Sequence, residues 1–463
     1  MKLTIHEVMN ATKGILIQGN DNKIIEGIST DSRSIRNNDL FIPIVGEMFD
    51  GHDFIQSAIN QNPICILVNS SYNKCWSNYK DLVIIQVKDT LKGFHDIARY
   101  YKSKFNIPTI AVTGSTGKTT TKEMIYEVLS QKYKVLKNKG NFNNHIGLPK
   151  TVFELDQSHE IAIFEMGMSG FGEIDTLASI VKPDVSVISN IGLSHIEHLG
   201  SQENIRKAKM EVVNYFDESS TLIINGDDLF LQEVKENHNT YKCLSIGFED
   251  DCDFRAIIKK DMYAEGIIFE VDYNQHKETY SLKVAGKHNV YNALCAIAVG
   301  ILFKVDIESI TKAISSFEGS DMRLHVKNAK NNITIIDDTY NASPDSMKAA
   351  INVLGTIAPE RTIAVLGDML EMGEYAKAGH YNVGCEVGKN NLDLLITVGK
   401  ESENIKVGAI KNGLEDKNAF SCKENKEVIK ILEKILKEND TILVKGSRGM
   451  KMEQIVHYIQ ERS

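Results

Sequence analysis

Short apolar runs alternate with amphipathic stretches over most of this chain. From about residue 108 to 320, the strand-length runs are "IPTIAVTG", "IAIFEMG", "VSVISNIG" and "TLIINGDD". From 321 to 463 the same texture returns in "ITIIDDTYN", "RTIAVLGD", "DLLITVGK" and "TILVKGSRG". This alternation predicts mostly parallel sheets with helices on both faces. Residues 1 to 107 mix short strands with polar loops, so we predict an α/β protein with three domains, 1–107, 108–320 and 321–463.

One predicted helix, "NIRKAKMEVVNYF" at 204–216, carries a charge on its apolar side. Its apolar stripe consists of Ile205, Val212, Val213 and Phe216. Arg206 and Lys207 are expected on the solvated side, but Lys209 lies inside the stripe. Burial lowers the pKa of an amine, and a neutral amine can react with carbon dioxide to form a carbamate. A lysine can also extend its ammonium from the edge of such a stripe into water, so both interpretations stay open.

Composition narrows the choice of partner and compartment. The formal net charge of -9 argues against nucleic acid or an anionic membrane as the main partner. The start, "MKLTIHEVMN", has no signal-peptide pattern, and no apolar run approaches the roughly 20 residues that span a bilayer. Seven scattered cysteines without a CxxC pair are typical of reduced thiols. We therefore expect a cytoplasmic protein that does not insert into membranes.

A glycine-rich turn follows the first strand of the second region, in "IPTIAVTGSTGKTTTKEM". Strand, turn and helix in this order are typical of a phosphate-binding loop, with main-chain N–H groups and the helix N-terminus facing the phosphates. Lys118 would reach the β- and γ-phosphates, and Thr119 would offer its hydroxyl to Mg²⁺. Val112 stands where GxxxxGK[ST] requires glycine, so the loop is a variant. Its predicted nucleotide-binding residues are Gly114, Ser115, Thr116, Gly117, Lys118, Thr119 and Thr120.

Two further polar residues follow strands of the same predicted sheet. Glu165 ends "IAIFE", where a carboxylate that binds Mg²⁺ is expected, although a solvated strand-end glutamate has the same pattern. His195 follows "VSVISNIGLS", in a loop leaving a predicted parallel strand. A lone histidine is commonly structural, but this position is where open α/β sheets bind ligands.

The string "TGSTGKTTT" resembles the nucleotide loop of the Mur ligases and folylpolyglutamate synthases. The resemblance implies an ATP-dependent amide ligase with a central P-loop domain and a C-terminal Rossmann-like domain. It also implies that Glu165 and His195 bind metal. The segment "AKMEV" is similar to the family's "AK.E", which implies that Lys209 carries a carbamate that serves as a third ligand.

Other strings extend the resemblance to the ATP site. "HNVYN" is similar to the family's "HNxxN" element, which implies that Asn292 contacts adenine. Arg323 can pair with the γ-phosphate, and Asp338 can accept hydrogen bonds from ribose hydroxyls. The resemblance implies that the third domain closes over ATP through these two residues, which would exclude water from a reactive intermediate.

The remaining strings concern the other substrates. Residues 1–107 contain "TDSR", "DLF" and "GEMFDGHDF", which resemble a uridine-diphosphate-binding domain, so Ser32 and Arg33 are implied as contacts. The polar loop "GNFNNHIG" implies contacts to the peptide substrate from Asn141, Asn143 and Asn144. "VKGSRGMKME" implies that the incoming carboxylate is bound by Lys445, Ser447 and Arg448.

Together these strings are most similar to the family member that adds D-Ala-D-Ala to UDP-N-acetylmuramoyl-tripeptide. That similarity implies ATP, two Mg²⁺ ions, a carbamylated Lys209 and an acyl-phosphate intermediate, with Lys118, Lys209, His195 and Arg323 as catalytic residues. The tripeptide can end in lysine or diaminopimelate, and we expect a monomer. A Mur ligase with another amino-acid acceptor and a non-catalytic binder of UDP-peptides are the alternatives. The joint presence of Glu165, His195, Lys209 and Arg323 favours an enzyme.

Overall fold

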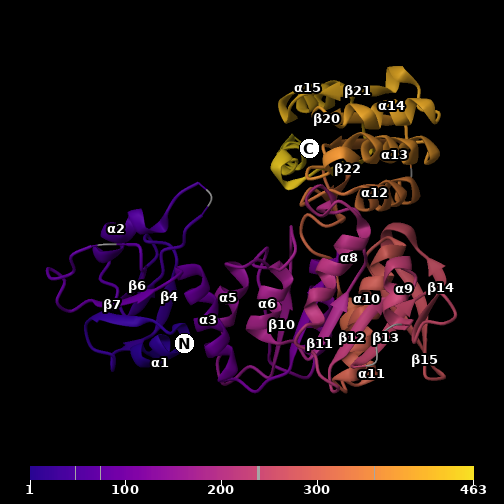
Figure 1. Cartoon of the computed structure of the whole chain (residues 1–463). Helices are drawn as coiled ribbons and strands as arrows, with labels where there is room; N and C mark the ends of the chain where they lie inside the picture. The colour runs from indigo at the N-terminus through magenta and orange to yellow at the C-terminus, as the bar shows by residue number, and fades with distance from the viewer. Residues whose placement is uncertain (47, 73, 237–239, 359, 463) are drawn as a thin grey trace.

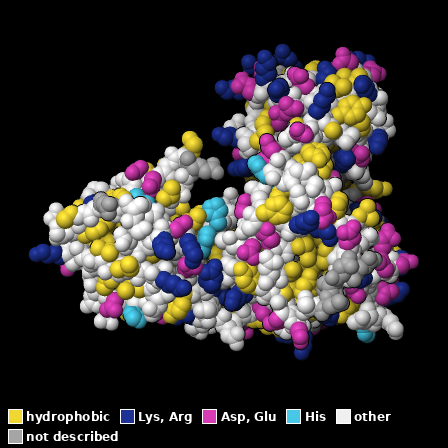
Figure 2. Space-filling model, in the orientation of Figure 1, with side chains coloured by type: hydrophobic (Ala, Val, Ile, Leu, Met, Phe, Trp, Pro, Cys, Tyr) yellow, Lys and Arg dark blue, Asp and Glu magenta, His cyan; other side chains and the backbone are white. Residues whose placement is uncertain are grey.

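The computed structural model describes residues 1–46, 48–72, 74–236, 240–358 and 360–462, and its strands form three large sheets, one in each third of the chain (Figure 1). Figure 1 shows the N-terminal unit beside the central unit, and the C-terminal unit above the central one. Figure 2 shows a hollow between the N-terminal and C-terminal units, open to solvent on the face in view.

The N-terminal unit has a five-stranded sheet in which only the edge strand β2 runs antiparallel to its neighbour. In spatial order the strands are β2 (Ile15–Gln18), β7 (Val83–Val87), β6 (Cys65–Asn69), β5 (Asp39–Phe41) and β4 (Gly27–Ser29). A small antiparallel pair joins β1 (Leu3–Thr4) to β3 (Ile24–Ile25). The helices are α1 (Ile5–Thr12), α2 (Ile55–Ile59) and α3 (Thr90–Ser103), with a 3-10 turn η1 (Gly51–Phe54).

Helix α3 attaches this unit firmly to the central one. Arg99 donates from Nε to the Ser179 carbonyl at 3.1 Å, and the Tyr101 hydroxyl donates to the Leu155 carbonyl at 2.8 Å. Ser179 lies in α6 (Glu173–Val181) and Leu155 just after α5 (Gly147–Val152), and buried hydrophobic residues of both units belong to one continuous core.

The central unit contains a nine-stranded sheet whose first seven strands are parallel. In spatial order they are β9 (Val135–Lys137), β10 (Ile161–Glu165), β8 (Thr109–Thr113), β11 (Val185–Ile188), β12 (Thr221–Asn225), β13 (Lys242–Gly247) and β14 (Phe254–Asp261). The antiparallel strands β15 (Ile267–Tyr273) and β16 (His276–Leu282) extend the far edge. The mostly parallel sheet was predicted, but this hairpin extension was not.

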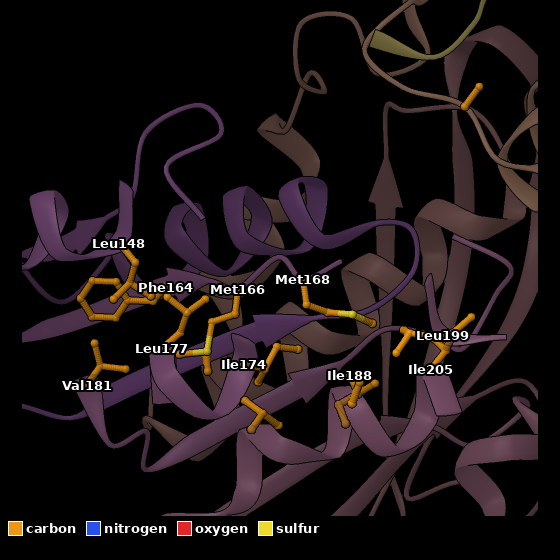
Figure 3. Packing of buried hydrophobic residues seen from close by; sticks show 14 of the residues in the cluster. Leu148, Phe164, Met166, Met168, Ile174, Leu177, Val181, Ile188, Leu199 and Ile205 are labelled. Carbon is orange, nitrogen blue, oxygen red and sulfur yellow. The ribbon is translucent and has the colours of Figure 1, made fainter. Parts of the chain in front are cut away.

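Helices cover both faces of the central sheet, as expected. The helices are α4 (Lys118–Leu129), α5 (Gly147–Val152), α6 (Glu173–Val181), α7 (Ile196–Leu199), α8 (Gln202–Met210), α9 (Leu229–Glu236), α10 (Lys287–Leu302) and α11 (Ile307–Ser316). Along β8, Ile110 and Val112 join the core under α4 and α10, whereas Ala111 joins the core of the opposite face. Figure 3 shows that second core, where Phe164 of β10 lies near Leu177 of α6 and Ile188 of β11 lies further along, toward Leu199.

The C-terminal unit has a six-stranded sheet that is parallel except for its first strand. In spatial order the strands are β17 (His325–Asn328), β18 (Thr334–Asp338), β22 (Thr441–Lys445), β19 (Thr362–Gly367), β20 (Leu394–Val398) and β21 (Ala419–Cys422). The helices are α12 (Pro344–Ile357), α13 (Ala376–Lys389), α14 (Glu403–Lys411), α15 (Asn425–Ile435) and α16 (Glu453–Arg462), with 3-10 turns η4 (Gly373–Tyr375), η5 (Asp416–Asn418) and η6 (Arg448–Met450). No helix in the described part of the chain is long and apolar enough to cross a membrane.

The predicted helix at 204–216 is shorter than expected. Helix α8 ends at Met210, and a 3-10 turn, η2 (Glu211–Val213), continues it. Ile205 and Lys209 are both buried, as the pattern predicted, and Lys207 is exposed. Arg206, which was expected on the solvated side, is instead mostly buried, with its side chain 19% exposed. It pairs with Glu203 at 2.6 Å and with Glu233 at 3.3 Å.

Candidate active site

The phosphate loop follows β8 and ends where α4 begins. Gly114 has φ +146° and Gly117 has φ +78°. A Cβ on Gly114 would lie 1.9 Å from Ser189 Oγ, and a Cβ on Gly117 would lie 2.6 Å from Asn292 Oδ1. Both positions therefore require glycine, for backbone conformation and for space.

Asn190, just beyond β11, holds the loop in shape. Its carbonyl accepts from the Ser115 main-chain N–H at 3.0 Å, and its side-chain Oδ1 accepts from the Thr116 N–H at 2.9 Å. The Lys118 ammonium donates to the Gly114 carbonyl at 2.8 Å, so it lies within the curve of the loop. Burial lowers the pKa of Lys118 to about 8. A partly buried cation at this point favours an anionic ligand.

Glu165, the last residue of β10, is buried beside the phosphate loop. Its Oε1 accepts from Asn143 Nδ2 at 2.8 Å. Its Oε2 is buried without a hydrogen-bond partner, although Lys122 Nζ lies 3.6 Å away. Lys122 is itself fully buried, donates to the Asn138 carbonyl at 2.9 Å, and pairs with Glu123 at 3.1 Å. The unpartnered oxygen is an available ligand atom.

His195, in the loop after β11, contacts the C-terminal unit. Its Nδ1 donates to Glu371 Oε2 at 2.5 Å. This hydrogen bond is the main reason that the pKa of Glu371 lies below its usual value. His195 also lines the same cavity as the phosphate loop, so its ring joins a neighbouring unit on one side and faces the site on the other.

Lys209 lies on α8 and is only 1% exposed. Burial and the nearby Lys118 ammonium both lower its pKa well below the ordinary value. Among the described residues, no carboxylate forms an ion pair with it. Conversion to a carbamate would replace repulsion from Lys118 with attraction, and it would add oxygen ligands at this point.

Asn292 lies in the first half of α10 and is buried. Its Oδ1 accepts from the Thr121 hydroxyl at 3.0 Å, and its Nδ2 donates to Asn289 Oδ1 at 3.0 Å. The side chain thus joins α10 to the helix after the phosphate loop. The predicted contact to adenine would have to share these hydrogen-bonding atoms. Nearby His288 faces the same cavity, and burial lowers its pKa to about 4.

Arg323 comes from the segment that enters the C-terminal unit. Its Nη2 donates to the Thr119 hydroxyl at 3.2 Å, and its guanidinium carbon lies 3.8 Å from the centre of the Tyr340 ring. The cation therefore sits at the mouth of the phosphate loop, held by an aromatic face.

Asp338 and Lys445 end the paired strands β18 and β22, and they form a buried ion pair at 2.5 Å. Lys445 also donates to the Asn341 carbonyl at 2.9 Å. Burial lowers the pKa of Lys445, against the pull of Asp338. The two residues were predicted to serve different ligands, but the structure pairs them with each other.

Ser447 and Arg448 differ in exposure. Ser447 is buried, and its hydroxyl accepts from the Leu370 N–H at 2.9 Å, so it supports a neighbouring loop. Arg448 is 58% exposed and lies 3.4 Å from Glu453. Of these two, only Arg448 lines the cavity.

Ser32 and Arg33 lie in the turn after β4, in the N-terminal unit and away from the main cavity. Arg33 pairs with Asp31 at 2.8 Å, and this contact lowers the pKa of Asp31 to about 2. Asn144 Oδ1 accepts from the Gly147 N–H at 2.8 Å and so begins α5. Arg33 and Asn144 are both exposed to solvent.

One cavity of about 580 Å³ joins most of these residues. The predicted residues that line it are Ser115, Thr116, Gly117, Lys118, Thr119, Thr120, Asn141, Asn143, Asn144, Glu165, His195, Asn292, Arg323, Asp338, Lys445 and Arg448. The predicted residues outside its lining are Ser32, Arg33, Gly114, Lys209 and Ser447.

Sequence reasoning missed two residues next to the predicted ligands. Lys122 follows Lys118 by one helical turn, so a second lysine at this spacing was a usable signal. Glu371 had no local signal, because its partner His195 is 176 residues away in the chain.

The residues around the phosphate loop fit Mg²⁺. No group of three or more His, Cys, Asp and Glu side chains suited to a metal occurs in the part of the chain that the structure describes. Mg²⁺ commonly binds through one or two carboxylates together with substrate phosphates and water. Glu165 offers a buried unpartnered oxygen, Thr119 a hydroxyl, and Lys209 a site for a further carboxylate.

A P-loop, an adjacent buried carboxylate and a second α/β unit that brings an arginine to the loop define a nucleoside-triphosphate-dependent enzyme. Family models agree: residues 112–300 match the Mur ligase middle domain, 322–448 the Mur ligase glutamate ligase domain, and 24–102 the Mur ligase catalytic domain. The chain belongs to the Mur ligase family.

Individual relatives cover nearly the whole chain. The UDP-N-acetylmuramoyl-tripeptide–D-alanyl-D-alanine ligase of Bacillus subtilis is 38% identical over 98% of this chain and 98% of its own length. The Escherichia coli enzyme of the same name is 30% identical over 100% and 99%. A crystal structure of MurF from Acinetobacter baumannii superposes with a TM-score of 0.90 at 28% identity, over 100% and 99% of the two chains. MurF ligase from Thermotoga maritima in complex with ADP gives 0.82 at 28%, over 94% and 97%.

Proposed function

We propose that this protein is an ATP-dependent amide ligase that joins D-Ala-D-Ala to UDP-N-acetylmuramoyl-tripeptide and releases ADP and phosphate. This reaction is the last cytoplasmic step in making the UDP-linked pentapeptide for peptidoglycan. The observation that carries the proposal is the single cavity in which the phosphate loop, Glu165 and cationic residues of the C-terminal unit meet. The relatives named above, aligned end to end, support the choice of substrates.

The phosphate loop and the C-terminal unit together form the proposed ATP site. The main-chain N–H groups at the start of α4, residues 117–120, would face the phosphates, because the Ser115 and Thr116 N–H groups already donate to Asn190. Lys118 donates to Gly114 and Arg323 to Thr119 of the same loop, and both cations would balance the charge of the γ-phosphate. Asp338 would bind ribose, and Asn292 would bind adenine. Each side chain can form further hydrogen bonds in addition to those it makes in the structure.

Thr119, Glu165, His195 and a carbamylated Lys209 would hold two Mg²⁺ ions. When bound, the ions neutralise charge on the phosphoryl group being transferred. The support is the buried, unpartnered Glu165 oxygen and the buried Lys209 amine beside Lys118. Asn143, predicted to bind substrate, contacts Glu165 and would orient it.

The two other substrates would enter from opposite units. Ser32 and Arg33 would contact the uridine-diphosphate end, and Asn141 and Asn144 the peptide. Arg448, exposed at the cavity edge, would bind the dipeptide carboxylate. Lys445 also lines the cavity and would share its ammonium between Asp338 and the dipeptide carboxylate. Ser447 would act indirectly by supporting the loop at Leu370.

The reaction follows from this arrangement. The terminal carboxylate of the tripeptide attacks the γ-phosphate, ADP leaves, and an acyl phosphate forms. The amine of D-Ala-D-Ala then attacks the acyl carbon, and phosphate leaves with the bonding electrons. Positioning and fixed positive charge supply most of the acceleration. Contact between the central and C-terminal units would keep water from the acyl phosphate.

The proposal also includes the domain boundaries, the compartment and the oligomeric state. We place the domain boundaries at 1–107, 108–320 and 321–463, with uridine-diphosphate, ATP and dipeptide binding in that order. The protein would act as a cytoplasmic monomer without a nucleic-acid partner.

One assay tests the function directly. Phosphate release from ATP is measured with UDP-N-acetylmuramoyl-tripeptide, with and without D-Ala-D-Ala, for the lysine and the diaminopimelate tripeptides. Release that requires the dipeptide supports the proposal, and the preferred tripeptide identifies the third residue. Stimulation by a single amino acid would identify another ligase of the family, and no stimulation by any acceptor would indicate a non-catalytic binder.

A further inference from the structure

The loop that follows β19 in the C-terminal unit contacts the His195 loop of the central unit. Beyond the hydrogen bond from His195 to Glu371, the Glu197 N–H donates to the Glu371 carbonyl at 3.3 Å. The Tyr375 hydroxyl donates to the Gly200 carbonyl at 3.2 Å. Main-chain and side-chain contacts therefore fix the two loops against each other at several points.

Both partners of the central contact have unusual backbone conformations. His195 has φ +64° and Glu371 has φ +60°, in the left-handed region that non-glycine residues seldom adopt. Such conformations persist only where surrounding contacts hold them, and they gather at functional sites. Two such residues meet here, across the boundary between the central and C-terminal units.

The Glu371 loop is supported from behind by buried groups. His380 is fully buried, donates from Nδ1 to the Ala376 carbonyl at 2.7 Å, and accepts from the Met369 N–H at 2.9 Å. The buried Ser447 hydroxyl accepts from the Leu370 N–H. These supports fix the main chain just before Glu371, so its carboxylate is presented at a defined place.

The hydrogen bond selects one tautomer of His195. A carboxylate only accepts, so Nδ1 carries the proton and the lone pair of the neutral ring lies on Nε2. Among the described residues Nε2 makes no hydrogen bond, and His195 lines the cavity that holds Glu165 and the phosphate loop. A histidine that ligates metal commonly donates its other nitrogen to a carboxylate in this way.

We infer that Glu371 is a positioning residue that the C-terminal unit supplies to the metal site of the central unit, by orienting His195. The inference rests on the proposed function, in which His195 binds Mg²⁺. It follows that docking of the C-terminal unit completes the metal site. A surface ion pair that only joins the two units is the alternative, and it predicts no effect on Mg²⁺.

The test compares Glu371→Gln with Glu374→Gln, an exposed acid on the same loop. ADP binding is measured by calorimetry on the full-length protein, first in EDTA and then over a Mg²⁺ titration. We expect both variants to bind ADP in EDTA like the wild type. For Glu371→Gln, the Mg²⁺ concentration that raises ADP affinity should be about tenfold higher than for the wild type. Replacing a residue that supports a metal ligand typically costs about 10–100-fold, and we expect the lower value because Glu371 is half exposed. Glu374→Gln should titrate like the wild type.

A double-mutant cycle separates positioning from general stability. His195→Gly removes the ligand and tolerates the positive φ, and Glu371→Gln in that background should have no further effect on the Mg²⁺ requirement. An unchanged Mg²⁺ titration in Glu371→Gln, or an equal loss in the His195→Gly background, would overturn the inference. If Glu371→Gln did not fold, Glu371→Asp, which keeps the charge but shortens the reach, should show the same Mg²⁺ defect in smaller degree. If the wild-type protein showed no dipeptide-dependent phosphate release, the proposed function would be overturned instead.

Discussion

Replacing Lys122 by methionine tests whether the buried carboxylate beside the phosphate loop depends on a buried cation. Methionine keeps most of the volume of the lysine stem and removes its charge. The change deletes the charge 3.6 Å from Glu165 Oε2 and the hydrogen bond to the Asn138 carbonyl, which would then be left without this donor. At an effective dielectric constant of about 20, the attraction to Glu165 alone is roughly 4–5 kcal/mol before desolvation is counted.

The net cost is smaller than this attraction, because burying Lys122 is itself unfavourable. Breaking a buried pair by removing one partner typically costs about 3–5 kcal/mol. The contact to Glu165 is longer than a hydrogen bond, so we expect a cost near the lower end, about 3 kcal/mol. This corresponds to roughly a hundredfold faster hydrogen exchange of the main-chain amides in β8 and β10, measured region by region in the full-length protein.

Lys137→Met is the matched control for this prediction. Lys137 pairs with the same Glu123 but is partly exposed and leaves no buried carboxylate behind. An exposed pair contributes about 0–1 kcal/mol, so exchange in β10 should change only a few-fold. If Lys122→Met accelerated exchange by less than tenfold, or no more than Lys137→Met did, the buried ion pair would not be the stabilising interaction that we describe.

Three further outcomes are expected. Lys209→Arg keeps the charge but cannot form a carbamate, so it should lose most ligase activity while Lys207→Arg remains near wild type; full turnover of Lys209→Arg at low bicarbonate would return the residue to a structural role. Gly114→Ala places a Cβ against Ser189 Oγ and should weaken ADP binding more than tenfold by calorimetry, whereas Gly172→Ala, also at positive φ but in open space, should leave ADP binding unchanged. Burial alone would raise the pKa of Glu7, but hydrogen bonds led by that from Lys104 lower it to about 2. The ionised form therefore stabilises the fold above pH 4.5, and Glu7→Gln should cost about 1–2 kcal/mol there; this difference should vanish as pH falls toward 2, as followed by fluorescence of the single tryptophan, and a constant difference would contradict it.

Local patterns were sufficient for the elements and for much of the site. The apolar runs predicted the parallel strands that carry Glu165 and Asp338, because strand periodicity and the residue that ends a strand are properties of neighbouring positions. The carboxyl ends of parallel strands share one edge, so the prediction that Glu165 lies near the phosphate loop followed as well. The place of Asp338, which ends a strand of another sheet, was expected only from the family resemblance. Burial of Lys209 was readable from helical spacing in the same way.

Hydrogen-bond partners could not be predicted in this way. Asn143, predicted to contact substrate, also donates a hydrogen bond to Glu165, and Ser447, predicted to bind a carboxylate, accepts one from the Leu370 N–H. The antiparallel hairpin β15–β16 was missed, because its polar alternation resembles that of exposed loops and its place at the sheet edge depends on packing.

The chain alone therefore determines which residues can do chemistry: two glycines that must have positive φ, a lysine in an apolar stripe, and acids at strand ends. The tertiary structure determines which of them meet. Lys445 pairs with Asp338 across 107 residues and His195 with Glu371 across 176, because the order of strands and the docking of whole units bring them together. No local pattern encodes these choices, since they depend on burial and shape complementarity between segments far apart in the chain.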